Sequence, residues 1–258
     1  MAKEPSPKHA VAFFDGQNFF HSAKAAFGYV FPNYDPSALT RKLCDDNGWE
    51  CTGIRFYTGF PDASDNPFWH HFWTAKGALM GREGVHVFMR PLRYRNRQVR
   101  LPDGSVHTYL DADEKGIDVR IALDVIRLAL RREFDVAILF CRDQDLSEVA
   151  DEIRVIAQEQ KRWIKIASAY PYSPAAKGTR GIDRTDWIKI DRATYDASID
   201  KRDYRPKKES LPASWRGGSS VDSGASLSLA SRPNSFSLRY SVERPMPSRR
   251  AISDMCPS

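Results

Sequence analysis

The chain has 258 residues, of which 41% are hydrophobic, so it is long enough to bury a sizeable core in one large domain or two small ones. No apolar run approaches the ~18 residues of a membrane span, and the first residues lack the apolar segment and cleavage site of a signal peptide. We therefore expect a cytoplasmic protein without a membrane partner. The four cysteines (Cys44, Cys51, Cys141 and Cys256) form no C-x-x-C pair, which argues against a zinc knuckle or a disulfide framework.

The net charge of +6 is concentrated at the C-terminus. Residues 201–258 contain 11 Lys/Arg and 5 Asp/Glu, whereas residues 1–200 contain 28 of each. The last part of the chain is also rich in Ser, Pro and Arg and lacks periodicity, so it buries too little apolar surface to offset its chain entropy. We predict a short N-terminal tail at 1–9, one domain at 10–198 and a disordered basic tail at 199–258.

Within the domain, strand and helix patterns alternate. Apolar or β-branched runs predict strands at 10–14, 52–60, 85–90, 136–140, 163–169 and 187–190, and amphipathic patterns predict helices near 35–48, 66–80, 113–132 and 145–160. Strands that are apolar throughout are typical of a sheet covered on both faces. The pattern predicts an α/β fold, a three-layer α/β/α sandwich with a mostly parallel central sheet.

One segment departs from this alternation. Residues 90–110 contain two short strand-like runs around Pro102-Asp103-Gly104, which predicts an inserted β-hairpin. Period-2 alternation places Arg93, Arg95 and Arg97 on the same side of its first arm, and these arginines are candidate RNA-binding residues. A solvated charged ribbon explains the pattern equally well.

Acidic residues follow two of the predicted strands. Asp15 ends the first, in FFDGQN, and Asp143 and Asp145 follow the strand VAILF, while Asp118 lies at the start of the helix before that strand. Ligands in open α/β sheets bind beyond the carboxyl ends of the strands, so neighbouring first and fourth strands would bring these acids together. Several carboxylates in one crevice repel one another unless a divalent cation lies among them.

Each acid also has a structural alternative. Asp145 and Glu148 have the D-x-x-E spacing of a capping box, so Asp145 could cap a helix, a role that leaves other oxygens free for a metal. Asp143 precedes that position by two and is harder to explain as a cap. Asp15 before Gly16 could be a turn residue. Asn18 could cap the first helix or orient a metal-bound water.

Asp124 lies six residues after Asp118 on the predicted helix. Six residues correspond to roughly 9 Å along the helix axis and a rotation of about 240°. One ion cannot easily bind both side chains. We therefore expect Asp118 to be the ligand and Asp124 to support the site from a second layer or to brace a loop.

The motifs FFDGQN, EKGIDVRIALDVI, VAILFCRDQDLSEVADEIR and RGIDRTDWIKI resemble the NYN domain family, the LabA-like group of the PIN-like ribonuclease superfamily, over roughly 10–192. The resemblance implies a metal-dependent endoribonuclease in which Mg²⁺ or Mn²⁺ activates water to hydrolyse an RNA phosphodiester. By the same resemblance Asp15, Asp118, Asp143 and Asp145 are the metal-binding and catalytic residues.

The chain departs from the family pattern before its second acidic motif. Where the family has Ser-Gly before the two aspartates, this chain has Cys141-Arg142. Arg142 could bind substrate phosphate, or it could pair with an aspartate and weaken metal binding. The alternative function is therefore a non-catalytic module that binds RNA or protein, and a protein partner or a second copy of the chain remains open. A small phosphoester hydrolase is a third and weaker interpretation.

Overall fold

The computed structural model describes residues 2–101, 104–176 and 180–206. Most of the tail expected at 199–258 lies outside these residues. The central sheet has six parallel strands in the order β3-β2-β1-β6-β7-β8. These strands are β1 (Lys8–Asp15), β2 (Trp49–Phe60), β3 (His86–Pro91), β6 (Val136–Phe140), β7 (Lys165–Pro171) and β8 (Asp186–Ile190). The predicted parallel sheet is confirmed, and β1 and β6 are neighbours.

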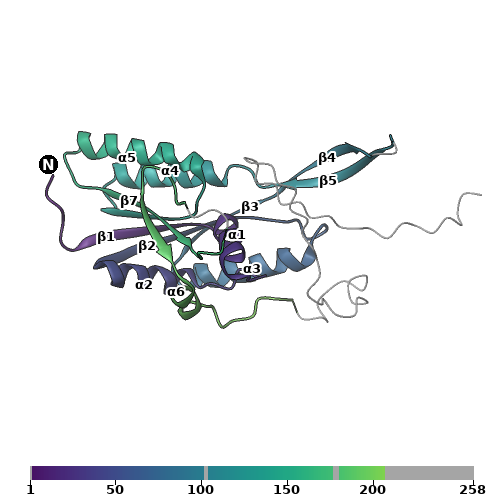
Figure 1. Cartoon of the computed structure of the whole chain (residues 1–258), viewed down its shortest axis with the longest axis horizontal. Coiled ribbons are helices and arrows are strands. Elements are labelled where there is room, and N and C mark those ends of the chain that lie inside the picture. The colour runs from purple at the N-terminus through teal and green to yellow at the C-terminus, as the bar shows by residue number, and fades with distance from the viewer. Residues whose placement is uncertain (1, 102–103, 177–179, 207–258) are drawn as a thin grey trace, which may run out of the picture.

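Helices cover both faces of the sheet (Figure 1). They are α1 (Gly16–Phe27), α2 (Pro36–Asn47), α3 (Pro67–Arg82), α4 (Ile117–Leu130), α5 (Ser147–Glu159), α6 (Arg192–Ala197) and the 3₁₀ turn η1 (Gln144–Leu146). In the described part of the chain, none of the helices is both long and apolar enough to cross a membrane.

Alternation along β1 divides the core into two layers. Ala12 and Phe14 pack with α1, α2 and α3, whereas Val11 and Phe13 pack with α4 and α5. All four side chains are buried, as expected for a strand covered on both faces. The ring of Phe14 stacks on that of Phe140 in β6, with centroids 3.8 Å apart. This packing fixes the last residues of β1 and β6 beside each other.

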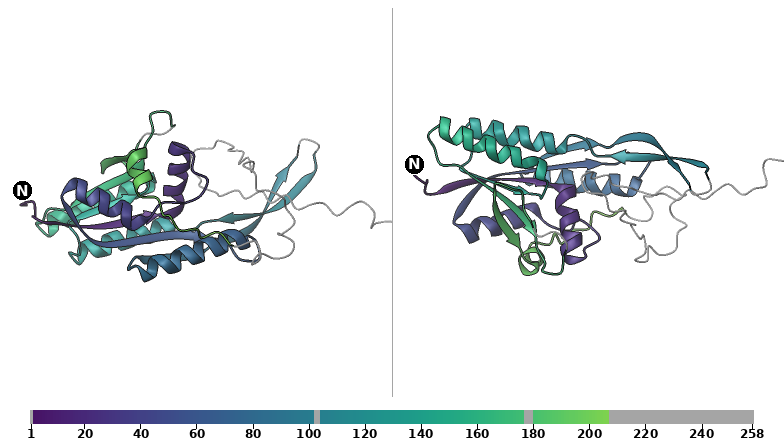
Figure 2. Two further views of the ribbon diagram at one scale, coloured as in Figure 1. Left: turned by 90° about the horizontal axis from the view of Figure 1, so that it is seen from below. Right: turned by 45° about the horizontal axis from the view of Figure 1, so that its top comes forward.

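The predicted hairpin is also present. Strands β4 (Arg93–Arg100) and β5 (Val106–Asp113) pair antiparallel in a separate two-stranded sheet, and this ribbon projects from the body in each view (Figures 1 and 2). Two contacts hold its base to the end of β2. The N–H of Leu92 donates to the carbonyl of Phe60, and the N–H of Asp62 donates to the hydroxyl of Tyr94.

The first described residues of the expected tail pack against the domain. Tyr204 is buried, and the ammonium of Lys76 lies 4.9 Å from the centre of its ring. Lys76 is fully buried, donates to the carbonyl of Tyr34 at 2.9 Å and pairs with Asp200 at 3.3 Å. Burial lowers the pKa of Lys76, and Asp200 opposes that effect. Residues 199–206 therefore form part of the folded unit.

Candidate active site at the carboxyl edge of the sheet

Asp15 is both the last residue of β1 and the cap of α1. Its side chain is 6% exposed, and one carboxylate oxygen accepts the N–H of Asn18 at 2.9 Å. Gly16 follows because there is no room for a side chain: a Cβ there would lie 2.6 Å from the ring of Phe56. The capping role leaves the second carboxylate oxygen available to another ligand.

Asp143, not Asp145, is the capping residue after β6. Its carboxylate accepts the N–H of Asp145 at 3.1 Å and caps η1, while α5 begins at Ser147 without a side-chain cap. The D-x-x-E spacing predicted the cap at Asp145, which is wrong because a 3₁₀ turn lies between Asp143 and the start of α5. Asp143 is half-buried at the end of β6, whereas Asp145 is exposed at the rim.

The acids at this edge interact with one another. Burial is the main cause that raises the pKa of Asp15 from 3.8 to about 7, and the carboxylates of Asp143 and Asp118 add to it. Burial likewise raises the pKa of Asp143, with further contributions from Asp145 and Asp118. Asp118 lies in the first turn of α4, where the helix dipole favours a negative charge. Negative charge therefore accumulates where β1, β6 and α4 meet.

Glu114 belongs to the same cluster and was not predicted from the sequence. It follows β5 directly, and its carboxylate accepts the N–H of Gly59 at the end of β2. Burial, followed by the charge of Asp15, raises its pKa from 4.5 to about 8, and Asp118 contributes as well. The sequence pattern predicted a helix near 113–132 that included Glu114, whereas β5 extends to Asp113 and α4 begins only at Ile117.

The donor chemistry suits a hard divalent cation. The four carboxyl groups (those of Asp15, Glu114, Asp118 and Asp143) supply oxygen ligands, which Mg²⁺ and Mn²⁺ prefer. Burial is the main cause that raises three of their pKa values, and a cation would relieve the repulsion that adds to it. As placed, no three His, Cys, Asp or Glu side chains among the described residues are arranged to hold an ion. The fit of a divalent cation to these four carboxyl groups therefore rests on the type of ligand atom and on the negative charge of the groups.

Asn18 connects the two strand ends. Its side-chain oxygen accepts the backbone N–H of Arg142 at 2.9 Å, and Asn18 is itself buried. Asp15 already caps α1, so the expectation that Asn18 could be that cap is wrong. Asn18 instead ties the first turn of α1 to the loop after β6.

Asp124 lies in an arginine cluster. It is 1% exposed, accepts the hydroxyl of Tyr57 at 2.8 Å and pairs with Arg120 and Arg127, each at 2.9 Å. Arg55 approaches it at 3.6 Å. These contacts account for its burial and join α4 to β2. Asp124 therefore braces α4 against β2 rather than a loop, and its role beside the site stays a prediction.

Arg142 is held by neutral groups. Its Nε donates to the carbonyl of Arg180 at 2.8 Å, and its guanidinium lies 5.4 Å from the centre of the Tyr170 ring. Burial lowers its pKa, and Tyr170 opposes that change. In the described ranges Arg142 makes no ion pair with an aspartate, so the arrangement does not weaken the acid cluster in that way.

The three hairpin arginines lie on the ribbon, and all are exposed. Arg97 pairs with Asp111 and with Asp113, the latter at 3.3 Å. Arg93 and Arg95 make no ion pair with any residue that the structure describes. The period-2 placement of the three on one strand is confirmed by the register of β4 on β5.

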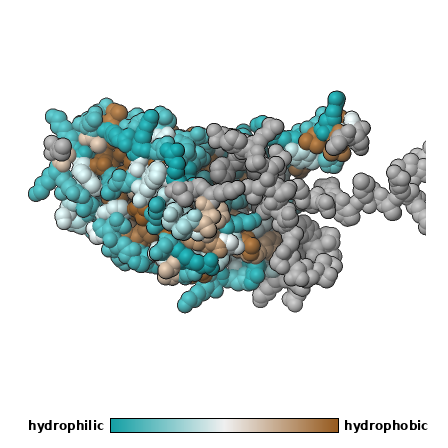
Figure 3. Space-filling view, in the orientation of Figure 1, coloured by the Kyte–Doolittle hydropathy of each residue, from teal (hydrophilic) through white to brown (hydrophobic). Residues whose placement is uncertain are grey.

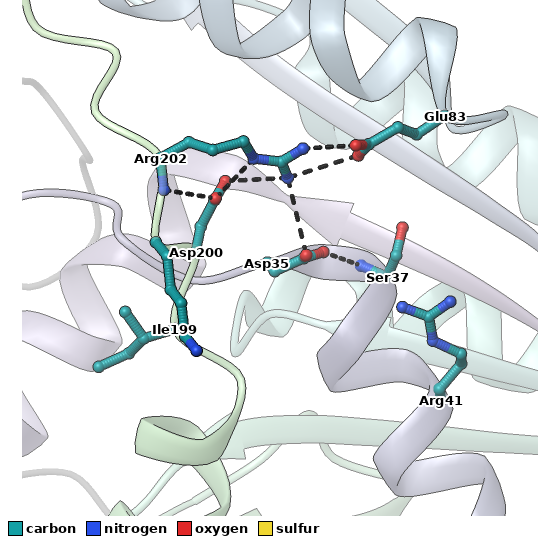
Figure 4. A pocket seen from close by; sticks show the side chains of 8 residues that line it. Asp35, Ser37, Arg41, Glu83, Ile199, Asp200 and Arg202 are labelled. Carbon is teal, nitrogen blue, oxygen red and sulfur yellow. Dashed lines mark hydrogen bonds and ion pairs between the residues drawn. The ribbon is translucent and has the colours of Figure 1, made fainter.

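A pocket of about 600 Å³ lies away from the acids, between α2, the end of α3 and residues 199–202 (Figure 4). Arg202 crosses it and pairs with Glu83, with Asp200 at 2.8 Å and with Asp35 at 3.7 Å. None of the four clustered acids lines this pocket. Its three acids all pair with Arg202, and these contacts hold residues 199–202 to the domain.

Comparison with known proteins identifies the family to which the chain belongs. Comparison with curated proteins gives no match. Among solved structures, the chain is similar to VPA0982 of Vibrio parahaemolyticus RIMD 2210633, a protein of unknown function, at 19% identity and a TM-score of 0.45, covering 74% of this chain and 98% of that one. It is also similar to MurG of Acinetobacter baumannii, at 11% identity and a TM-score of 0.28, covering 71% and 46%. The NYN domain model matches residues 9–175, so the chain belongs to the NYN domain family, a PIN-like nuclease family.

Proposed function

We propose that this protein is a metal-dependent endoribonuclease. The observation that carries the proposal is the cluster of mutually repelling carboxyl groups at the ends of β1 and β6, in a chain of a PIN-like nuclease family. The family implies an RNA substrate and a divalent metal. Asp15, Glu114, Asp118 and Asp143 are the proposed ligands, and Asp145 contributes from the rim.

The residues around the acids prepare them for this role. The N–H of Asn18 orients the carboxylate of Asp15, and the N–H of Gly59 orients that of Glu114. Each of these backbone donors lowers the pKa of the carboxyl group that it contacts and so favours its charged form. Bound Mg²⁺ or Mn²⁺ would activate a water molecule and stabilise charge on the phosphoryl oxygens. The acids hold the ion, and no protein nucleophile is required.

The test is cleavage of a mixed pool of structured and single-stranded RNA by the full chain, with Mn²⁺, with Mg²⁺ and with EDTA. Asp15→Asn and Asp143→Asn keep side-chain oxygens that can cap α1 and η1 while removing charge. Glu152→Gln, at an exposed position on α5, is the matched control. We expect cleavage that depends on metal, falls at least about 100-fold in both aspartate variants and persists in the control.

Two results would overturn the proposal. Cleavage that persists in both aspartate variants would show that another site catalyses the reaction. Folded wild-type protein that binds RNA without cutting it under any metal condition would identify a binding module. In that case the first variant to test for cleavage would replace Cys141-Arg142 with the Ser-Gly of the family.

A further inference from the structure

The β4–β5 ribbon is a separate two-stranded sheet, and much of its surface is exposed. Isolated two-stranded hairpins are at best marginally stable in water, and here most residues of β4 and half of those of β5 are exposed. The surface of the ribbon carries hydrophilic and hydrophobic groups side by side (Figure 3). Its base is fixed to the domain by Leu92, Tyr94 and Glu114. A ribbon held this way keeps its outer part away from the domain and exposed.

The two faces of the ribbon differ in chemistry. Directly opposed residues of an antiparallel pair lie on the same face, and the register pairs Arg97 with Tyr109 and Val99 with His107. The face with Arg93, Arg95 and Arg97 therefore also carries Tyr109 and His107 in its outer part, and the buried Asp111 and Asp113 near its base. We call the three arginines and the two aromatic residues the arginine–aromatic face. The opposite face carries Thr108 and the exposed side chains of Val106 and Leu110.

The two aromatic rings of this face are parallel. The planes of His107 and Tyr109 lie within 12° of each other, and their centroids are 6.5 Å apart. Parallel rings along one strand have the same relative orientation as successive bases in a stack. Stacking on such rings is how proteins hold single-stranded nucleic acid without reading its sequence.

The arginines of the face divide into two groups. The register places Asp111 and Asp113 opposite Arg95 and Arg93, but both acids pair with Arg97 instead. Arg93 and Arg95 are exposed and lack an ion pair among the residues described. Their guanidinium groups are available to phosphate, to which arginine binds in bidentate geometry.

We propose that the arginine–aromatic face binds single-stranded RNA and delivers it to the acid cluster. This inference rests on the proposed function and names its substrate class. Tyr109 and His107 stack on bases, which only an unpaired strand exposes, while Arg93 and Arg95 contact the phosphates. The strand β5 that carries Tyr109 ends beside Glu114, about 17 Å further along at ~3.4 Å per residue. RNA lying along the ribbon therefore reaches the metal ligands.

The test is binding of a fluorescent oligouridylate and of a blunt RNA duplex to the full chain in EDTA, where metal-dependent cleavage cannot occur. Tyr109→Ala should weaken oligouridylate binding about 5-fold or more, whereas Tyr109→Phe keeps the ring and should bind as the wild type does. Thr108→Ala, on the opposite face of the same strand, is the matched control. Arg93→Ala should reduce the salt dependence of binding by about one phosphate contact.

Three results would overturn the inference. The first is equal binding of oligouridylate by Tyr109→Ala and Thr108→Ala, and the second is a preference for the duplex. The third is that Tyr109→Ala abolishes a dimer of the RNA-free protein, which would assign the face to a second copy of the chain. The outcome is separable from that of the proposed function. Oligouridylate binding that needs Tyr109 without any cleavage would refute only the nuclease, whereas cleavage unaffected by the ribbon variants would refute only this inference.

Discussion

The side-chain oxygen of Asn18 accepts the backbone N–H of Arg142 at 2.9 Å. This hydrogen bond joins residues 124 positions apart and links the first turn of α1 to the loop after β6. Asp15 lies three residues before Asn18 and Asp143 directly follows Arg142, so the separation of the two acids depends on this link. The geometry of the acid cluster is therefore set partly by an uncharged amide.

Replacing Asn18 with alanine should destabilise the fold and the site together. The N–H of Arg142 would lose its acceptor, at a cost of about 1–3 kcal/mol in the free energy of unfolding. Denaturant unfolding measures this cost, and the RNA cleavage rate should fall by more than the loss of folded protein explains. Asn96→Ala, at an exposed position on the ribbon, is the control. Wild-type stability in Asn18→Ala would show that the link is not needed.

The raised pKa of Asp15 predicts how stability depends on pH without metal. The unfolded chain releases this proton near 3.8, whereas the folded chain keeps it until about 7. The folded state thus binds more protons in that interval, so the free energy of unfolding falls as pH rises from about 4 to about 7. Asp15→Asn should remove part of the fall and be more stable than the wild type at pH 8, by about 1–3 kcal/mol.

Thermal unfolding across this pH range, in EDTA and then with Mn²⁺, measures the effect. Added Mn²⁺ should restore stability to the wild type at pH 8 and have much less effect on Asp15→Asn, because the variant lacks one carboxylate. The exposed Glu152→Gln should follow the wild-type curve in both conditions. A variant less stable than the wild type at pH 8 would contradict the predicted sign.

Glu114→Gln tests the acid that the sequence did not reveal. Glutamine keeps an oxygen that can accept the N–H of Gly59, so the end of β2 should stay in place. The loss of one negative charge should weaken Mn²⁺ binding about 10-fold or more, measured by calorimetry on the full chain. Asp145→Asn, at the exposed rim, should weaken it less. Equal effects of the two variants would exclude Glu114 from the ligand set.

The sequence was sufficient for the sheet and for the acids of the main strands, because both depend on local patterns. An apolar run followed by a carboxylate predicts Asp15 and Asp143 at one edge whenever the two strands are neighbours. Glu114 lacks that signal, since it follows a strand of the ribbon rather than of the central sheet. Its approach to Gly59 depends on how the ribbon docks, which no local pattern encodes.

Two other features could not be predicted from the sequence, for similar reasons. The cap at Asp143 depends on a 3₁₀ turn whose hydrogen bonds compete closely with those of an α-helix. The burial of Lys76 depends on Tyr204, which lies in a segment whose composition is that of a tail. Both result from contacts that form only after the chain has folded.

Cys51 should be the most reactive of the described thiols. A side-chain hydrogen bond with Cys44 lowers the pKa of Cys51 from 9.0 to about 7 and raises that of Cys44, while the thiol of Cys51 also donates to the carbonyl of Gly53 at 3.9 Å. Cys51 is partly exposed, whereas Cys44 and Cys141 are buried. The thiolate is the reactive form, so iodoacetamide at pH 7 should modify Cys51 first in a Cys256→Ser background, as mass spectrometry would show.

Cys44→Ala removes the donor and should slow modification of Cys51 roughly 10-fold at pH 7, because less of the sulfur is then ionised. Cys44→Ser keeps a hydroxyl donor at the same position and should react nearly as fast as the parent. The ratio of these two rates isolates the hydrogen bond from any change in packing, since both variants remove the same sulfur atom. Equal rates in the two variants would mean that exposure alone makes Cys51 reactive.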